Sequence, residues 1–292
     1  MKFGLCLPNF GGKIGARDLL ELGVIAEANN FDSVWATDHI IMPRQLKSPY
    51  DELYEPFVTL AAIAARTNNV KLGTSILVLP QRDPILVGKQ AATIDQLSNG
   101  RTILGVGAGW VEEEFHFLGA KFKRRGEVLD EAIDLLRRLW SDGVVNYPGQ
   151  FFKVSDAVFF PKPKQKLIPI WVGGNSEPAI ERAARVGDGW HPVGVDPARI
   201  AHGGARVKKA NAMKTISLRL SVDVRKARDD YVSPSGERRE TLSGSDREID
   251  SRLEEYAKAG LEYLVAYIYH EEVKEIITDV KRFSAEIIRS FS

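Results

Sequence analysis

The sequence is poor in cysteine, in charge of any one sign and in long apolar runs. Its 292 residues include one cysteine, Cys6, so no disulfide forms within the chain and a reducing compartment is expected. Lysine and arginine number 40 against 39 acidic residues, which leaves no overall field to favour nucleic acid or an anionic membrane. No stretch approaches the roughly 18 apolar residues of a membrane span, and no apolar signal stretch opens the chain. We therefore expect a cytoplasmic protein that acts on a small molecule, without nucleic-acid or membrane partners.

The motifs of several enzyme classes are also missing. The five histidines show no HExxH or paired-ligand spacing, so no metal site is expected. Neither a GxSxG elbow nor a GxxxxGK[ST] phosphate loop occurs. Gly105-Val106-Gly107 lacks the third glycine and the position near the chain start of a Rossmann fingerprint. These absences disfavour zinc-dependent, serine-hydrolase and P-loop chemistry.

What the chain does contain is a regular alternation of strand-like and helix-like segments. With 44% hydrophobic residues it can build a sizeable core. Strict alternation with short connections predicts a parallel sheet with helices outside it, here an α/β fold of the (β/α)8 TIM-barrel type, as one domain over residues 1–292. The expected strands are Lys2–Leu7, Ser33–Ala36, Val70–Leu77, Thr102–Gly105, Ile168–Val172, Asp188–His191, Ile216–Asp223 and Tyr263–Ile268. The expected helices are Ala16–Asn29, Pro56–Thr67, Pro84–Leu97, Arg125–Trp140, Pro178–Arg185, Pro197–Met213, Asp246–Ala259 and Glu271–Ile288.

Two insertions interrupt this alternation. Val144–Val158 predicts a β-hairpin that turns at residues 147–150, with aromatic and β-branched residues on both sides. Arg228–Ser245 is rich in polar residues, glycine and proline and predicts a mobile loop after the seventh strand. This second segment is interpreted either as an active-site lid or as a disordered surface loop.

Polar residues follow three of the predicted strands, and in a parallel barrel these strand ends meet at one mouth. His39 follows the second strand and is expected to donate or accept a proton beside a bound ring, with Asp38 orienting the ligand. Alternatively, Asp38 shapes the loop and His39 packs. Asn9 follows the first strand, where its amide contacts substrate or shapes the turn. Ser75 ends the third strand, where hydroxyls usually satisfy backbone groups.

Two small-residue loops follow the fourth and fifth strands. Gly107-Ala108-Gly109 would let a ligand approach the backbone, and Gly173-Gly174-Asn175-Ser176 precedes a helix whose free N–H groups suit a phosphate. Asn175 or Ser176 is expected to cap that helix. Trp190, on the sixth strand, either flanks a flat ring or packs in the core. Glu112, Glu113 and Glu114 are interpreted as complements to a helix dipole.

Together these segments resemble the luciferase-like monooxygenase superfamily, and most closely its branch that uses the deazaflavin coenzyme F420. The residues that carry the resemblance run from Lys2 to about Pro192. They are KFGLCLPNFGG, FDSVWATDHI, EPFVTLAAIAARTNNVKLGTSILVLPQRDP, KQAATIDQLSNGRTILGVGAGWVEEEF, PIWVGGNS and AARVGDGWHP. The match is weaker beyond Pro192.

The resemblance implies a TIM-type barrel with the cofactor across the carboxyl ends of its strands. Asp38 and His39 match the family's cofactor-contacting and proton-handling pair. Ser75 and Ile76 match the position of a non-prolyl cis peptide that backs the deazaflavin ring. The loop Gly107–Gly109 matches the one along the cofactor side chain, and Gly173, Gly174 and Asn175 match its phosphate end.

One departure from the family pattern concerns the substrate. Deazaflavin sugar-phosphate dehydrogenases carry an acidic Glu directly after the GxG loop, where this chain has Trp110. The resemblance therefore implies a less polar pocket, with Asn9 and Trp110 as substrate walls, and disfavours sugar-phosphate oxidation. The expected function is hydride transfer between F420 and an organic substrate. A homodimer is compatible with the sequence, which does not fix the oligomeric state. The alternatives are an FMN-dependent two-component monooxygenase and a non-catalytic F420-binding protein.

Overall fold

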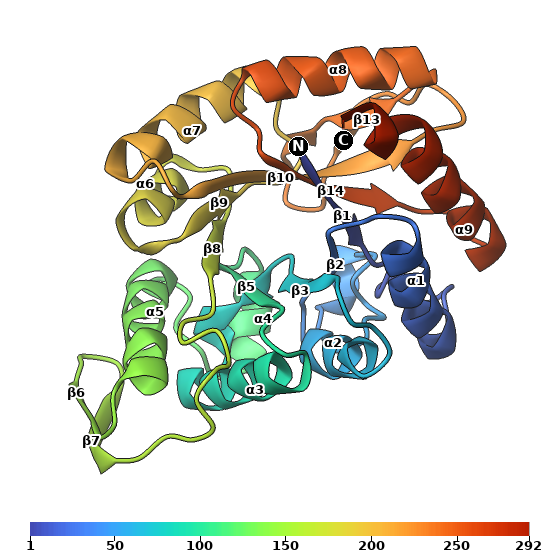
Figure 1. The fold of residues 1–292 in the computed structure, drawn as a ribbon. Helices are drawn as coiled ribbons and strands as arrows, with labels where there is room; N and C mark the ends of the chain where they lie inside the picture. The colour runs from blue at the N-terminus through green and yellow to red at the C-terminus, as the bar shows by residue number, and fades with distance from the viewer. Residues whose placement is uncertain (292) are drawn as a thin grey trace.

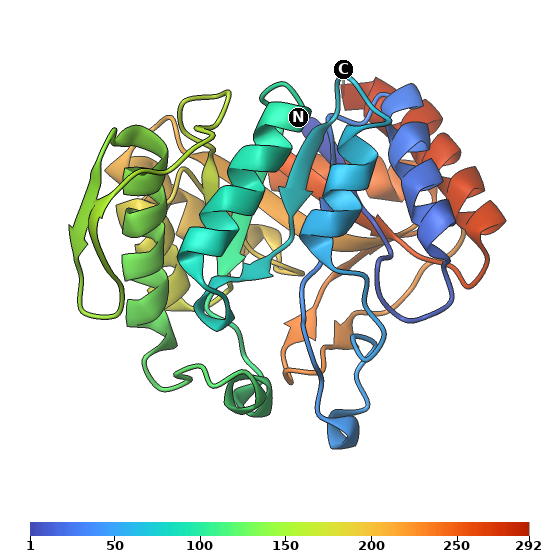
Figure 2. The ribbon, with the colours of Figure 1, turned by 90° about the horizontal axis from the view of Figure 1, so that it is seen from below.

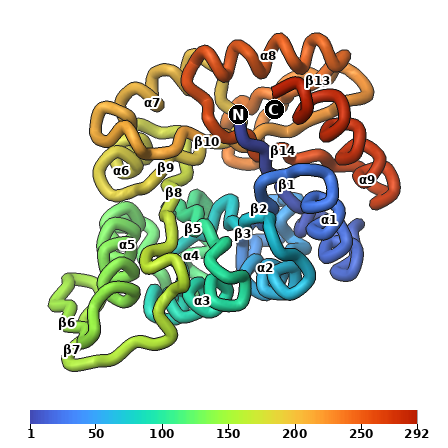
Figure 3. Tube along the Cα trace, viewed as in Figure 1, coloured from blue at the N-terminus to red at the C-terminus, as the bar shows by residue number. Residues whose placement is uncertain are grey.

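The computed structural model describes residues 1–291, in which eight parallel strands close into a barrel inside a layer of helices (Figures 1 and 3). Strand pairing runs from β1 through β2, β3, β5, β8, β9, β10 and β14 and back to β1. This confirms the predicted (β/α)8 fold. The strands are β1 (Lys2–Cys6), β2 (Ser33–Ala36), β3 (Lys71–Thr74), β4 (Leu77–Val78), β5 (Thr102–Gly107), β8 (Ile170–Gly173), β9 (Gly189–His191), β10 (Thr215–Asp223) and β14 (Tyr263–Ile268).

Several of the helices begin where the sequence supplies proline or a capping side chain. Asp83 accepts hydrogen bonds from the N–H groups of Ile85 and Leu86 at the start of α3, and Ser245 forms a capping box with Glu248 at α8. The helices are α1 (Ala16–Ala28), α2 (Pro56–Ala64), α3 (Pro84–Leu97), α4 (Glu112–Phe117), α5 (Arg125–Ser141), α6 (Glu177–Val186), α7 (Pro197–Ala210), α8 (Asp246–Lys258) and α9 (Val273–Arg282). In residues 1–291 no helix is both long and apolar enough to cross a membrane.

The predicted third strand is divided into β3 and β4. The division falls at the peptide bond between Ser75 and Ile76, which is cis, as the resemblance implied. β3 pairs with β2 and with the start of β5, and β4 pairs with the end of β5. The third position of the barrel is therefore shared by two short strands.

Aromatic side chains fill the interior of the barrel. Trp35 stacks on Trp171 with ring centroids 5.1 Å apart, and Tyr263 meets Trp171 edge-on at 5.2 Å. Their strands β2, β8 and β14 are not neighbours, so these rings meet inside the barrel. Glycine in the adjacent strand β3 makes room for them, since a Cβ on Gly73 would lie 2.2 Å from Cε3 of Trp35.

Both predicted insertions are present, but the turn of the first and the secondary structure of the second differ from the prediction. The hairpin consists of β6 (Val145–Pro148) and β7 (Lys153–Ala157), so its connection, residues 149–152, begins two residues later than predicted. Arg228–Ser245 is not an irregular loop throughout. It contains the antiparallel pair β11 (Tyr231–Val232) and β12 (Arg238–Arg239) and then β13 (Thr241–Ser243), which adds to the edge of β10.

Three segments project from the end of the barrel where the strands finish (Figure 2). They are the short helix η1 (Arg44–Leu46) after β2, α4 after β5, and the β11–β12 pair after β10. Because each follows the carboxyl end of a parallel strand, they surround the face where the sequence places the site.

Candidate active site

His39 forms a buried pair with a carboxylate that comes from another strand end. Its Nδ1 lies 2.8 Å from Oε2 of Glu114, the third residue of α4. The other carboxylate oxygen accepts hydrogen bonds from the N–H groups of Ile40, at 2.7 Å, and Ile41, at 3.3 Å. His39 is 8% exposed and Glu114 is fully buried. The pair therefore joins the loop after β2 to the loop after β5.

The protonation of this pair follows from its contacts. Burial alone would raise the pKa of the Glu114 carboxyl, but the hydrogen bonds from His39 and Ile40 outweigh burial and lower that pKa below its ordinary value. An ionised carboxylate only accepts, so Nδ1 of His39 carries a proton and donates it. Nε2 has no partner in residues 1–291. This nitrogen can therefore take up or release a proton at a ligand.

Aromatic rings border the imidazole on two sides. Tyr50 lies 4.8 Å from His39 between ring centroids, and Trp110 meets it edge-on at 5.9 Å. Trp110 is half-buried, and its place in a substrate wall remains a prediction. The open imidazole nitrogen thus stands among apolar ring surfaces.

The cis peptide is held from two sides inside the barrel. The Ser75 hydroxyl lies 2.8 Å from Nε2 of His191, whose Nδ1 lies 2.8 Å from Oγ of Ser217. Because the Ser217 hydroxyl donates to the Trp190 carbonyl, it accepts from Nδ1, and Nε2 accepts from Ser75. Burial, with the charge of Arg219, lowers the pKa of His191 to about 3, so this imidazole is neutral. The Ser75 carbonyl accepts from Arg219 at 3.0 Å.

One glycine from each small-residue loop makes room for Ile76. A Cβ on Gly107 would lie 1.8 Å from Cδ1 of Ile76, and a Cβ on Gly173 would lie 2.8 Å from its Cγ2. Gly109 has φ of +80°, which favours glycine there, and Ala108 packs partly against the core. At Gly107 and Gly173 the small residue is explained by packing, and their cofactor contact remains a prediction.

The second small-residue loop differs from expectation at its cap. No side chain caps α6, and the Asn175 amide bonds instead with the backbone N–H and carbonyl of Val193, at 3.0 and 2.9 Å. The prediction that Asn175 or Ser176 caps the helix was therefore wrong. As a result the Glu177 N–H keeps no acceptor in residues 1–291, and Gly174 beside it has φ of +119°.

Asn9 and Asp38 are both committed within the protein. The Asn9 amide donates to the carbonyls of Thr37 and Tyr54, each at 2.8 Å, and accepts from the Thr37 N–H, and the residue is fully buried. The Asp38 carboxylate accepts from the Val78 N–H at 2.9 Å and forms an ion pair with Arg82 at 2.6 Å. The structure gives no support to the substrate contact predicted for Asn9 or to the cofactor contact predicted for Asp38, because both side chains bond to backbone groups at the strand ends.

Of the two places considered for Trp190, the structure shows core packing and gives no support to a contact with a flat ring. Trp190 is fully buried, and its indole N–H donates to the Gly174 carbonyl at 2.9 Å. A Cβ on Gly203 of α7 would lie 2.3 Å from the indole ring. Trp190 therefore faces outward from β9 against α7, on the side of the sheet away from the barrel interior.

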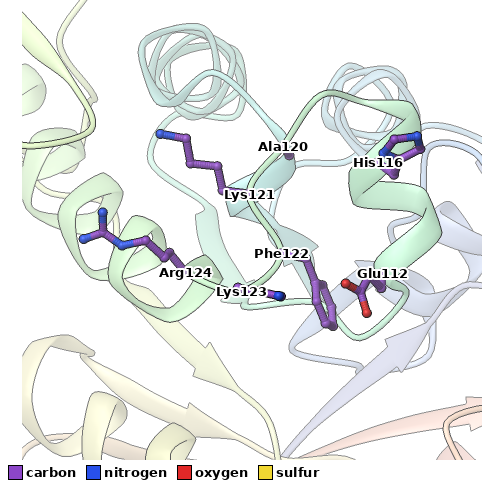
Figure 4. A pocket seen from close by; sticks show the side chains of 7 residues that line it. All are labelled: Glu112, His116, Ala120, Lys121, Phe122, Lys123 and Arg124. Carbon is purple, nitrogen blue, oxygen red and sulfur yellow. The ribbon is translucent and has the colours of Figure 1, made fainter.

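The described residues also form two depressions on the outer surface. One of about 360 Å³ borders the exposed side of α4 (Figure 4) and is lined by Glu112, His116, Ala120, Lys121, Phe122, Lys123 and Arg124. The other, of about 440 Å³, lies between α6 and α7 and is lined by Glu181, Ala184, Arg185, Arg206, Lys209 and Ala210. None of the predicted site residues lines either one.

The sequence reasoning missed three residues around this centre: Glu114, Tyr50 and Arg219. Glu112 and Glu113 are exposed, as expected for residues that complement a helix dipole, whereas Glu114 points back to His39. The signal was its spacing on α4 next to the buried Phe115. Tyr50 and Arg219 carry no local signal, because their neighbours in space lie far away in the chain.

Comparison with known proteins agrees with this architecture. The model of the family described as luciferase-like monooxygenase matches residues 1–230. Over 184 residues the chain is 36% identical to a protein of Amycolatopsis mediterranei named F420-dependent glucose-6-phosphate dehydrogenase. The match covers 61% of this chain and 54% of that protein, so the chain spans about half the length of this relative.

Solved structures with the same fold include two at 19% sequence identity. Monooxygenase RslO1 from Streptomyces bottropensis superposes with a TM-score of 0.85 over 100% of both chains. An F420-dependent secondary alcohol dehydrogenase, in complex with an F420-acetone adduct, superposes with a TM-score of 0.83 over 98% of both chains. These likenesses concern the fold. Because the family model matches residues 1–230 of 292, the chain belongs to the luciferase-like monooxygenase family, which its sequence motifs resemble.

Proposed function

We propose that this protein is an oxidoreductase that transfers hydride between coenzyme F420 and a small organic substrate. The observation that carries the proposal is the buried His39–Glu114 pair, whose free Nε2 stands at the mouth of a barrel of this family. Relatives and fold neighbours named as F420-dependent support the choice of cofactor.

The residues present at the strand ends fit a deazaflavin. The uncapped start of α6 offers the Glu177 N–H to a phosphate, and the Glu177 carboxylate beside it is neutralised by ion pairs with Arg199 and Arg206. Gly107, Ala108, Gly109, Gly173 and Gly174 would lie along the cofactor chain, and Ser75 and Ile76 would lie behind its ring. When bound, F420 supplies the hydride chemistry.

The protein itself supplies the proton and the position of the substrate. His39 holds or releases a proton at Nε2, and Glu114 fixes the ring in the tautomer that leaves this nitrogen open. Glu114 is thus a positioning residue. Trp110 and Tyr50 exclude water from one side and offer apolar surface to the substrate. The replacement of the family's acidic Glu by Trp110 disfavours a sugar phosphate.

The rival functions share the fold. An FMN-dependent two-component monooxygenase is favoured by one neighbour of the same fold, a Baeyer–Villiger monooxygenase solved in complex with FMN. A non-catalytic F420-binding protein would need the cofactor contacts and would not need the His39–Glu114 pair. The presence of that pair is the reason for preferring an enzyme.

A titration of the purified chain with oxidised F420 and, in parallel, FMN tests the proposal. We expect quenching of F420 fluorescence with an affinity well above that for FMN. We also expect bleaching of the F420 absorption band with some member of a panel of alcohols, aldehydes and enones. His39→Asn is expected to keep binding and lose turnover. Oxygen uptake with reduced FMN would favour the monooxygenase. Absence of both F420 quenching and bleaching would overturn the proposal.

A further inference from the structure

A buried arginine at the barrel mouth has a charge that nothing in the described residues neutralises. Arg219, on β10, is 7% exposed, and no carboxylate in residues 1–291 lies within ion-pair distance of it. Its Nη1 donates to Oγ1 of Thr37, at 2.9 Å, and to the Ser75 carbonyl, at 3.0 Å. Both acceptors follow strand ends, so the guanidinium lies at the level of the mouth.

The Nε–Nη2 edge of this guanidinium makes no hydrogen bond in the described residues. Nη1 uses both of its protons, whereas Nε and Nη2 have no acceptor in the described part of the chain. Neither atom is among the fully enclosed polar atoms that lack a partner, so both retain contact with solvent-accessible space. The Nε–Nη2 edge is the fork that binds a carboxylate through two parallel hydrogen bonds.

A second buried arginine shows what a purely structural role looks like in this fold. Arg101 is 9% exposed and donates through Nε, Nη1 and Nη2 to five acceptors, four of them backbone carbonyls. Arg219 makes two such bonds and otherwise faces the rings of Phe10 and Tyr267, whose centroids lie 5.8 and 5.2 Å from its Cζ. Because a buried charge is costly unless it is paired, the open edge of Arg219 favours an anion from outside.

A row of aromatic rings joins this edge to the proton-handling centre. Phe10 lies 5.2 Å from Tyr267 and 4.9 Å from Tyr50, and Tyr50 lies 4.8 Å from His39 between ring centroids. The apolar or conjugated carbon skeleton of a ligand would pack against these rings, with one end at Arg219 and the other at His39. We propose that Arg219 binds the carboxylate of an apolar or aromatic carboxylic acid. The substrates of the enzyme would then belong to this class. The role as a substrate rests on the proposed function, whereas the anion subsite rests on these contacts.

Binding of cinnamate and of its neutral analogue cinnamamide tests the subsite without any turnover. With the full chain we expect calorimetry to give roughly ten- to hundredfold tighter binding of cinnamate. Arg219→Met should remove this preference, and Arg219→Lys, which keeps the charge and loses the fork, should retain only a small part of it. Arg137→Met serves as a matched control, because Arg137 is paired with Asp188 away from the mouth and should leave the preference unchanged.

Several outcomes would overturn the inference. These are equal binding of acid and amide, binding of neither, a wild-type preference in Arg219→Met, or inorganic phosphate competing as strongly as cinnamate. If Arg219→Met does not fold, Arg219→Lys decides, since a full cinnamate preference there contradicts recognition by the fork. F420 affinity is measured in the same variants, because Arg219 also donates to the Ser75 carbonyl behind the proposed cofactor ring. If F420 fails to bind while the cinnamate preference holds, the proposed function falls and the anion subsite stands.

Discussion

At the scale of single residues, two buried carboxylates near the barrel mouth have different partners. Glu114 accepts from His39 and leaves its outer nitrogen open, whereas Asp38 is paired with Arg82 and with the backbone of β4. The first arrangement prepares a proton-transfer group and the second holds two strand ends together. This difference in partners leads to different expectations for the two substitutions.

Glu114→Gln should affect chemistry more than binding. The amide keeps the shape of the side chain but removes the charge that holds Nδ1 of His39 protonated. We expect turnover with the best substrate of the panel to fall by roughly 10- to 100-fold, with F420 affinity within about twofold. Nitrogen chemical shifts of His39 over a pH series should show a mixture of tautomers. Glu113→Gln, at an exposed neighbour, is the control, and equal losses in both variants would contradict the assignment.

Asp38→Asn should affect stability more than binding. The substitution leaves the Arg82 guanidinium, whose side chain is 14% exposed, without its closest carboxylate. We expect urea unfolding to report a loss of about 2 kcal/mol, because the largely buried Arg82 charge is then compensated only by Glu55, at 3.2 Å. Glu127→Gln, in an exposed pair with Arg124, should leave stability unchanged. A large loss of F420 affinity at unchanged stability would instead restore the cofactor contact predicted for Asp38.

Residue roles could be predicted from the sequence only where a motif carried them. The position of His39 after β2 and the cis bond after Ser75 followed from the family motifs and are present. The burial of Glu114 against His39 depends on a contact across 75 residues, and the Asn9 and Trp190 assignments depended on where a side chain turns. Local sequence does not encode those directions; in the structure the Asn9 amide bonds to the backbone of Thr37 and Tyr54, and Trp190 packs in the core.

At the scale of elements, β4, β5 and β8 fit together around one side chain. Ile76 occupies the space that Gly107 and Gly173 leave open, and it follows the cis bond that ends β3. The glycines that looked like a ligand loop in the sequence thus also serve the packing of neighbouring strands. This packing can be tested by adding a methyl group at Gly107.

Gly107→Ala should destabilise the fold, and Ile76→Val in the same chain should restore most of the lost stability. The added Cβ would lie 1.8 Å from Cδ1 of Ile76, the atom that valine lacks. We expect a loss of about 1–3 kcal/mol for Gly107→Ala and recovery of most of it in the double variant. Gly143→Ala, with no atom within 4 Å of its added Cβ, is the matched control. Additive losses in the double variant would show that the two positions do not share a space.

The elements themselves were largely predictable, and the exceptions have physical causes. Alternation and proline-initiated helices predicted every strand of the barrel, because each repeat buries an apolar strand under an amphipathic helix. The break between β3 and β4 depends on a peptide geometry that hydrophobic pattern does not report. Residues 231–243 form short strands although their composition is polar, because they pair with one another and with β10.

At the scale of the whole molecule, the barrel encloses a neutral histidine in its centre. His191 bonds with Ser75 and Ser217, stacks on Trp35 and is fully buried near the positive charge of Arg219. These contacts involve β2, β9, β10 and the strand end after β3, so protonating this ring would disturb four parts of the barrel. The stability of the fold as a whole should therefore depend on pH.

Stability should decrease on acidification already below about pH 6.5. The pKa of His191 is 6.5 when unfolded and about 3 when folded, so below pH 6.5 only the unfolded chain takes up this proton. The contribution is complete above pH 6.5 and is lost as the pH falls towards 3. Between about pH 6 and pH 5 the free energy of unfolding should approach a slope of about 1.4 kcal/mol per pH unit from this group alone. His191→Gln, which stays neutral, should flatten the urea-unfolding profile in this range although it lowers stability overall. An unchanged slope in that variant would mean that another group binds the proton, and that the ring at the centre of the barrel does not set the acid limit of the fold.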